Sequence, residues 1–170
     1  MSAGADNIEI QRGPRPGLLG DVAALHGRYY AAHWDFPTAF ETKVAREMAA
    51  FLDRYDAARD LALAVDGGDA RVGASITLDV SDPDLLAGEG HVRWFIIGDS
   101  LRGRGLGKAL MAEVLAFART TELTSIYLTT FRGLDAAAKL YRDAGFIVTD
   151  ERAGTTWGRT VIEQRLELRL

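Results

Sequence analysis

The chain has 170 residues, a formal net charge of −4, 48% hydrophobic residues and no cysteine. This composition is typical of a globular protein, and the length fits a single domain over residues 1–170 with a core that needs no disulfide. The acidic balance argues against nucleic acid or an anionic membrane as partner, because both attract basic surfaces. The absence of cysteine excludes thiolate metal sites and an acyl-cysteine intermediate, and three dispersed histidines argue against zinc.

The N-terminal third predicts one strand and two helices. The first residues lack the basic and apolar regions of a signal peptide, and no stretch has the length of a membrane span, so we expect a cytoplasmic protein. Residues 7–12 alternate and predict a strand, and residues 19–33 carry apolar side chains at helical spacing. A second helix is predicted to begin at Thr38, where Thr38 and Glu41 match a capping box just after Pro37.

The middle of the chain predicts three strands. Segments 60–65 and 71–78 read as strands, and Asp66-Gly-Gly-Asp69 between them is typical of a hairpin turn. A polar, proline-containing loop follows at 79–89. Residues 90–98 are nearly all apolar, which favours a central strand of the sheet.

The last third alternates helices and strands. Helices are predicted at 105–120 and 134–144, with a strand at 125–129 between them. Strands at 146–149 and 165–170 complete the chain. The alternation of the tail predicts an edge strand, which also suits the interface of a homodimer. The order of about seven strands and about four helices predicts an α/β (α+β) fold, a mixed sheet flanked by helices.

A glycine-rich run, Arg102-Gly-Arg-Gly-Leu-Gly-Lys108, lies between a predicted strand and a predicted helix. Its three glycines let backbone N–H groups turn toward a common point, and a helix N-terminus favours anions. Arg102, Arg104 and Lys108 add positive charge. The run therefore predicts a site for a phosphate-bearing ligand. The simpler interpretation is a glycine-rich helix start with solvated basic residues.

Spacing distinguishes between the known phosphate-binding loops. A P-loop would need glycine where Arg102 stands and a hydroxyl where Ala109 stands. The dinucleotide fingerprint would need a third glycine at Lys108. A nucleotide-binding protein is therefore disfavoured. The remaining pattern, Arg-x-x-Gly-x-Gly over Arg102, Gly105 and Gly107, resembles the pyrophosphate-binding motif of GNAT-superfamily acetyltransferases, whose loop holds coenzyme A.

A second stretch strengthens this resemblance. Residues 136–146, Ala-Ala-Ala-Lys-Leu-Tyr-Arg-Asp-Ala-Gly-Phe, are similar to a GNAT helix with a Leu-Tyr pair before Gly-Phe, and Gly145 suits a helix C-terminus. One helix and one strand separate the two motifs, as a βαβ unit requires. The resemblance is strongest over 60–150. It implies a mostly antiparallel GNAT sheet, with the cofactor cleft between splayed strands at 90–98 and 125–129.

The N-terminal stretch points to a narrower resemblance. Arg15-Pro-Gly-Leu-Leu-Gly20 and His26-Gly-x-x-Tyr30 are similar to acetyltransferase domains fused to MarR-type regulators, here without the DNA-binding part. That subfamily is poorly defined in substrate. The narrower match therefore adds little about chemistry.

The resemblance implies an acetyl-CoA-dependent N-acetyltransferase that needs no metal and transfers acetyl directly to a primary amine. Tyr141 would be the general acid that protonates the departing thiolate; its alternative role is a packed helix tyrosine. Thr130 stands where relatives often carry a cofactor-binding Asn. The full set implied to hold the cofactor is Phe95, Ile96, Ile97, Arg102, Gly103, Arg104, Gly105, Leu106, Gly107, Lys108, Thr130 and Tyr141.

The base and the acceptor site are less defined by the sequence. Glu89 and His91 precede the central strand, where relatives often place a base, although solvent could take the proton instead. Aromatic and acidic residues suited to an amine cluster at the end of the first predicted helix, and Trp157 could line the same cleft. This cluster comprises Tyr29, Tyr30, His33, Trp34 and Asp35. Arg159 would instead favour a carboxylate on the substrate. The rival function is a non-catalytic acyl-CoA-binding or sensing module.

Overall fold

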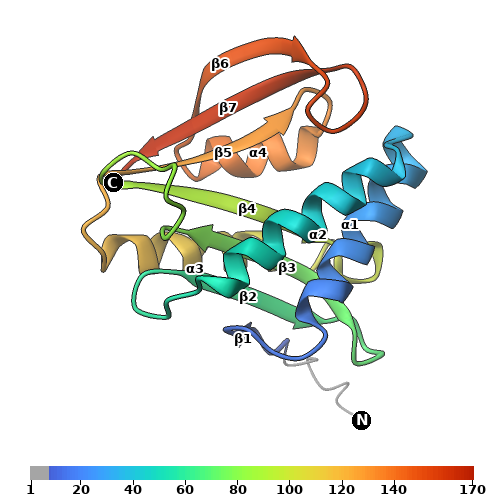
Figure 1. Ribbon diagram of the computed structural model, residues 1–170, viewed down its shortest axis with the longest axis horizontal. Coiled ribbons are helices and arrows are strands. Elements are labelled where there is room, and N and C mark those ends of the chain that lie inside the picture. Colours follow the sequence, from blue (N-terminus) through green and yellow to red (C-terminus); the bar gives the residue numbers. More distant parts are fainter. Residues whose placement is uncertain (1–7) are drawn as a thin grey trace.

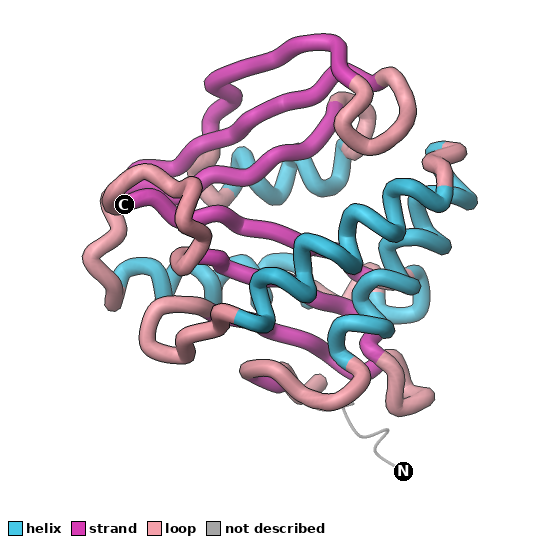
Figure 2. Tube along the Cα trace, viewed as in Figure 1, coloured by secondary structure: helices cyan, strands magenta, loops and turns pink. Residues whose placement is uncertain are grey.

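One sheet of seven strands, in the order β1-β2-β3-β4-β5-β7-β6, separates two helical layers in the computed structural model, which describes residues 8–170 (Figures 1 and 2). Helices α1 (Leu18–Trp34) and α2 (Thr38–Asp53) cover one face, and α3 (Leu106–Arg119) and α4 (Asp135–Asp143) lie on the other (Figure 1). The strands are β1 (Gln11–Arg12), β2 (Leu61–Asp66), β3 (Val72–Asp79), β4 (Glu89–Ile97), β5 (Ser125–Phe131), β6 (Ile147–Gly154) and β7 (Val161–Arg169). The mixed, mostly antiparallel sheet expected from the sequence is confirmed.

Each face of the sheet has its own hydrophobic core. Ile76, Leu110 and Val114 are fully buried in the cluster beneath α3. Met48 and Phe51 are buried in the cluster beneath α1 and α2. Both clusters include side chains of β2, because its consecutive residues point to opposite faces. Burial on both faces explains why β2 is apolar throughout from Leu61 to Val65.

The sheet opens between its two central strands. β4 and β5 run parallel and pair only from Glu89 opposite Ser125 to His91 opposite Tyr127. Beyond His91 the two strands diverge, and β5 continues its pairing with β7 alone as far as Phe131 (Figure 1). The splayed strands predicted from the sequence are confirmed.

A β-bulge interrupts β4 where the strands diverge. Thr77 pairs with Arg93 and Ser75 with Ile96, so two residues of β4 face one residue of β3. Trp94 adopts the left-handed conformation with φ of 47°, and its carbonyl accepts a 2.7 Å hydrogen bond from the buried Ser75 hydroxyl. The bulge shifts the alternation of β4 by one residue. As a result Trp94 packs beneath α1 and α2, whereas its neighbour in sequence packs against the opposite core.

Two details near the N-terminus differ from the expectations. The strand predicted at 7–12 is limited to Gln11–Arg12, and residue 7 lies outside the described residues. The capping box predicted for α2 is wrong. Pro37 is the N-cap without a side-chain hydrogen bond, and Thr38 is already in the first turn, where its carbonyl accepts a 3.2 Å bond from the Thr42 hydroxyl.

The tail strand also differs from its prediction. β7 begins at Val161 and is paired on both sides, with β5 and with β6, so it is not an edge strand. The edge is β6, which extends to Gly154 rather than ending at residue 149, and whose residues Ile147 and Val148 are exposed. The alternation of the tail arises because β7 lies within the sheet. It therefore offers no free edge to a second copy.

Candidate functional site

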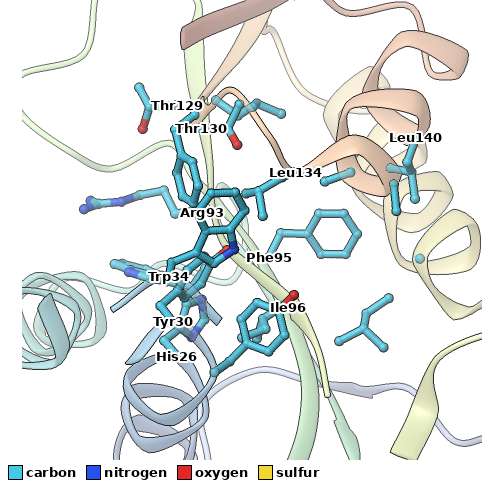
Figure 3. A pocket seen from close by; sticks show the side chains of 18 of the residues that line it. His26, Tyr30, Trp34, Arg93, Phe95, Ile96, Thr129, Thr130, Leu134 and Leu140 are labelled. Carbon is cyan, nitrogen blue, oxygen red and sulfur yellow. The ribbon is translucent and has the colours of Figure 1, made fainter. Parts of the chain in front are cut away.

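A cavity of about 790 Å³ passes through the gap between β4 and β5. It is lined by side chains of α1 and α2 from one layer and by the start of α3 and by α4 from the other. Figure 3 shows Tyr30 and Trp34 of α1, Phe95 of β4, Thr130 of β5 and Leu140 of α4 around this space. A ligand in this cavity would contact both faces of the sheet.

The glycine-rich run forms one end of the cavity. Gly103 and Gly105 both have φ of 73°, a conformation that favours glycine, and no atom lies within 4 Å of a Cβ placed on either. Gly105 is the N-cap of α3, so the loop ends at the positive end of a helix. Glycine is favoured at position 107 for a different reason, because a Cβ added there would lie 2.8 Å from Leu140 Cδ1. An open turn at a helix N-terminus suits the binding of a pyrophosphate.

The basic residues of the run take different positions. Arg102 lines the cavity, donates a 3.0 Å hydrogen bond to the Ile97 carbonyl and lies over the Tyr29 ring at 4.7 Å. Arg104 and Lys108 are exposed and are not among the lining residues. Of the other predicted cofactor residues, the cavity wall includes Phe95, Ile96, Ile97, Gly103, Gly105, Leu106, Gly107, Thr130 and Tyr141.

Tyr141 is held in the cavity wall by the end of α4. Gly145, with φ of 99°, lets its own N–H bond the Arg142 carbonyl and the Phe146 N–H bond the Tyr141 carbonyl, each at 3.0 Å. The Tyr141 ring contacts Phe146 and Phe95, each at 6.1 Å between centroids. Burial, with the nearby Tyr30 phenol, raises the pKa of Tyr141 above its usual value. The phenol therefore keeps its proton at neutral pH.

The two candidate bases differ in their relation to the cavity. Glu89 does not line it, and its carboxylate forms an ion pair with Arg165. His91 does line it and stacks on Tyr127 at 4.2 Å between ring centroids. Burial, helped by the charges of nearby cations, lowers the pKa of His91 to about 3. Its imidazole is therefore neutral and weakly basic.

The predicted acceptor residues Tyr30, His33, Trp34 and Trp157 all line the cavity. Trp157 reaches it from the loop between β6 and β7, as expected. In the sequence, Asp35 suggested an amine substrate and Arg159 suggested a carboxylate on the substrate. The two side chains instead form an exposed ion pair with each other, at 3.2 Å. Neither of them lines the cavity.

Several lining residues were missed from the sequence. His26 is buried, its ring nitrogen Nδ1 lies 2.8 Å from the Val22 carbonyl, and burial lowers its pKa to about 4. Glu47 of α2 pairs with Lys43 and with Arg93 of β4, all three in the cavity wall. Helical spacing on α2 was the available signal for Glu47, which lies one turn after Lys43. For Arg93 the available signal was a charged side chain in a predicted central strand of mostly apolar residues.

The described part of the chain has neither a cluster of metal ligands nor a membrane-spanning helix. Within residues 8–170, no three histidine, aspartate or glutamate side chains gather as metal ligands would. Among the helices of the same range, none combines the length and the apolar character of a membrane span.

Comparison with known proteins places the chain in a family. The model of the acetyltransferase (GNAT) family matches residues 26–146. N-acetyltransferase 8F1 of Rattus norvegicus is 31% identical over 128 residues, which cover 75% of this chain and 58% of the relative. N-acetyltransferase 8B of Homo sapiens is 32% identical over 53% of this chain and 40% of the relative. The chain thus spans about half the length of the curated relatives it matches.

Solved structures share the fold. The ribosomal-protein-alanine N-acetyltransferase of Brucella melitensis superimposes with a TM-score of 0.73 at 16% identity, over 95% of this chain and 99% of that one. A Salmonella typhimurium protein solved with its cofactor acetyl-CoA gives a TM-score of 0.70 at 17% identity, over 97% and 95%. Together with the family match, the two motifs and the cavity between β4 and β5, these similarities show that the chain belongs to the GNAT acetyltransferase family.

Proposed function

We propose that this chain is an acetyl-CoA-dependent N-acetyltransferase that transfers the acetyl group directly to a primary amine. The observation that carries the proposal is the single cavity through the sheet. It has a phosphate-compatible glycine loop at one end, aromatic walls at the other and a buried phenol between them. Its two ends lie on opposite faces of the sheet. Donor and acceptor can therefore approach the gap from opposite sides.

The coenzyme would lie on the side of α3 and α4. The amides of the loop from Gly103 to Gly107, together with Arg102, would bind the pyrophosphate, because the helix N-terminus and the guanidinium favour negative charge. Exposed Lys108 adds charge at the rim. The backbone of Phe95 to Ile97 has no β5 partner. Apart from the Ile97 carbonyl, which accepts the bond from Arg102, its polar groups that face the gap would be available to pantetheine amides in the manner of an added strand.

The central strand and α4 would supply the chemistry. A backbone N–H of β4 near Ile97 would stabilise the oxyanion that develops on the thioester carbonyl. Tyr141 would donate its phenolic proton to the sulfur as the C–S bond breaks, while the amine nitrogen forms the new C–N bond. The chain has no cysteine, which favours direct attack by the amine over an acyl-cysteine intermediate.

The amine must lose its proton before it attacks. Glu89 is paired with Arg165 outside the cavity wall, and the low pKa of His91 makes that imidazole a weak base. This geometry favours deprotonation through solvent. Glu47 faces the cavity from α2, but its carboxylate is paired with Lys43 and Arg93.

The test is amine-dependent release of coenzyme A thiol from acetyl-CoA across a panel of primary amines, with mass spectrometry of the products. The proposal expects release that requires the amine and an acetylated product. Tight binding of acetyl-CoA without amine-dependent release would favour the rival function, an acyl-CoA-binding module.

A further inference from the structure

The acceptor end of the cavity is an aromatic recess, formed by Tyr30, Trp34, Phe36, Phe131 and Trp157. The rings come from α1, from the α1–α2 connection, from β5 and from the β6–β7 loop, and they contact one another continuously. Tyr30 stacks on Phe36 at 5.4 Å, Trp34 meets Phe131 edge-on at 4.8 Å, and Phe131 lies 5.6 Å from Trp157. Such a packed wall has few alternative rotamers and is pre-formed for a flat apolar group.

The exposure of the rings decides which ones a ligand can touch. Phe36 and Phe131 are buried and form the support, whereas Tyr30, Trp34 and Trp157 are half-buried and present surface to the cavity. Figure 3 shows Tyr30 and Trp34 with their side chains toward the cavity, which they share with Phe95 of β4. Three aromatic surfaces therefore line the route to the reacting carbon.

The charges of α2 and β4 beside the recess are already compensated, and the other carboxylate of the cavity wall, Asp135, is exposed at the start of α4. Lys43 and Arg93 both pair with Glu47, and Arg93 also lies 3.4 Å from the buried carboxylate of Asp79. The Asp35 carboxylate is bound to Arg159 outside the cavity. A second cationic group on the acceptor would lose its hydration in the recess while the Glu47 carboxylate is committed to two cations.

We propose, on the basis of the acetyltransferase function above, that the acceptor is a monoamine bearing an aromatic or bulky apolar group. The aromatic recess binds the apolar body, and the amine lies toward the gap between β4 and β5. The nitrogen becomes neutral before it attacks, so it needs no lasting counter-charge in the recess. Diamines and polyamines keep a charge throughout the reaction and are disfavoured there.

The first experiment compares kcat/KM for 2-phenylethylamine, butylamine and 1,4-diaminobutane at saturating acetyl-CoA. The expected order is 2-phenylethylamine over butylamine by about 10-fold, and over 1,4-diaminobutane by about 100-fold. Trp157→Ala should reduce kcat/KM for 2-phenylethylamine by about 10-fold while the KM for acetyl-CoA stays within about two-fold, and Trp157→Phe should keep most of the activity. Equal or better use of the diamine, or an equal loss for all amines in Trp157→Ala, would overturn the proposal.

A binding experiment separates this proposal from the proposed function. All three tryptophans of the chain, Trp34, Trp94 and Trp157, line the cavity, so their fluorescence reports on its contents. With coenzyme A present, 2-phenylethylamine should change this fluorescence saturably and 1,4-diaminobutane should not. If no amine is acetylated, the enzymatic function fails, and the titration still decides the ligand class. Binding of the diamine with equal or higher affinity would refute the aromatic monoamine.

Discussion

Gly107 offers a quantitative test of how the glycine loop and α4 fit together. In Gly107→Ala the new methyl carbon would lie 2.8 Å from Leu140 Cδ1 and 3.2 Å from Ile97 Cδ1, so at least one of these side chains must move. Overpacking of this kind costs about 1–3 kcal/mol, and the better helix propensity of alanine offsets about 1 kcal/mol of it. The expected net loss of stability is therefore about 0–2 kcal/mol, or a Tm lower by a few degrees.

Two further variants make this prediction specific. Gly103→Ala adds a methyl group with no atom within 4 Å, so it should cost only the backbone strain of a left-handed alanine, about 1–2 kcal/mol. Combining Gly107→Ala with Leu140→Ala removes the clash. Urea unfolding of the double-mutant cycle should therefore show a favourable coupling of about 1 kcal/mol, which Leu140→Ala should not show with Gly103→Ala. No coupling, or a more stable Gly107→Ala single variant, would refute the packing argument.

Three other predictions concern charge and the bulge. The pKa of His91 is lowered from 6.5 in the unfolded chain to about 3 in the folded protein, so stability is lost as pH falls from 6.5 toward 3, at about 1.4 kcal/mol per pH unit. Urea unfolding at pH 7 and pH 5 should therefore show a smaller loss of stability for His91→Gln than for the wild type. An equal loss in both proteins would contradict this prediction. Ser75→Ala removes the donor to the Trp94 carbonyl and should cost about 1–3 kcal/mol in the same assay, whereas no change would mean that this bond does not support the bulge. Arg102→Ala should weaken coenzyme A binding by about 10-fold, most clearly at low salt, and unchanged calorimetric affinity would exclude Arg102 from the phosphate site.

Local patterns were enough to predict the parts of the site that depend on backbone conformation. Gly103 and Gly105 adopt the positive φ that their spacing indicated, and Gly145 ends α4 as expected. These features are local because a turn or a helix end needs particular residues at adjacent positions. The divergence of β4 and β5 followed from the order of the elements together with the family resemblance. The similarity to MarR-fused domains stays a prediction, since no comparison tests it.

Features that depend on distant contacts could not be predicted. Trp94 is followed by three more apolar residues, Phe95, Ile96 and Ile97, so the shift in alternation at the bulge leaves no mark in the pattern. Asp35 and Arg159 looked like opposing substrate contacts until the fold placed them in one ion pair, although 124 positions separate them. Glu89 stands near the cavity in sequence, but its carboxylate is held by Arg165 of β7. In each case a tertiary contact assigns the role.

We propose above that the buried phenol of Tyr141 protonates the leaving thiolate in this cavity. The most direct measurement is kcat for amine-dependent thiol release in Tyr141→Phe, with the Kd for acetyl-CoA measured on the same sample. We expect a kcat lower by about 100-fold or more with a Kd within about two-fold of wild type, because the variant keeps the packing against Phe95 and Phe146 and loses only the proton donor. A kcat within about two-fold of wild type would contradict it.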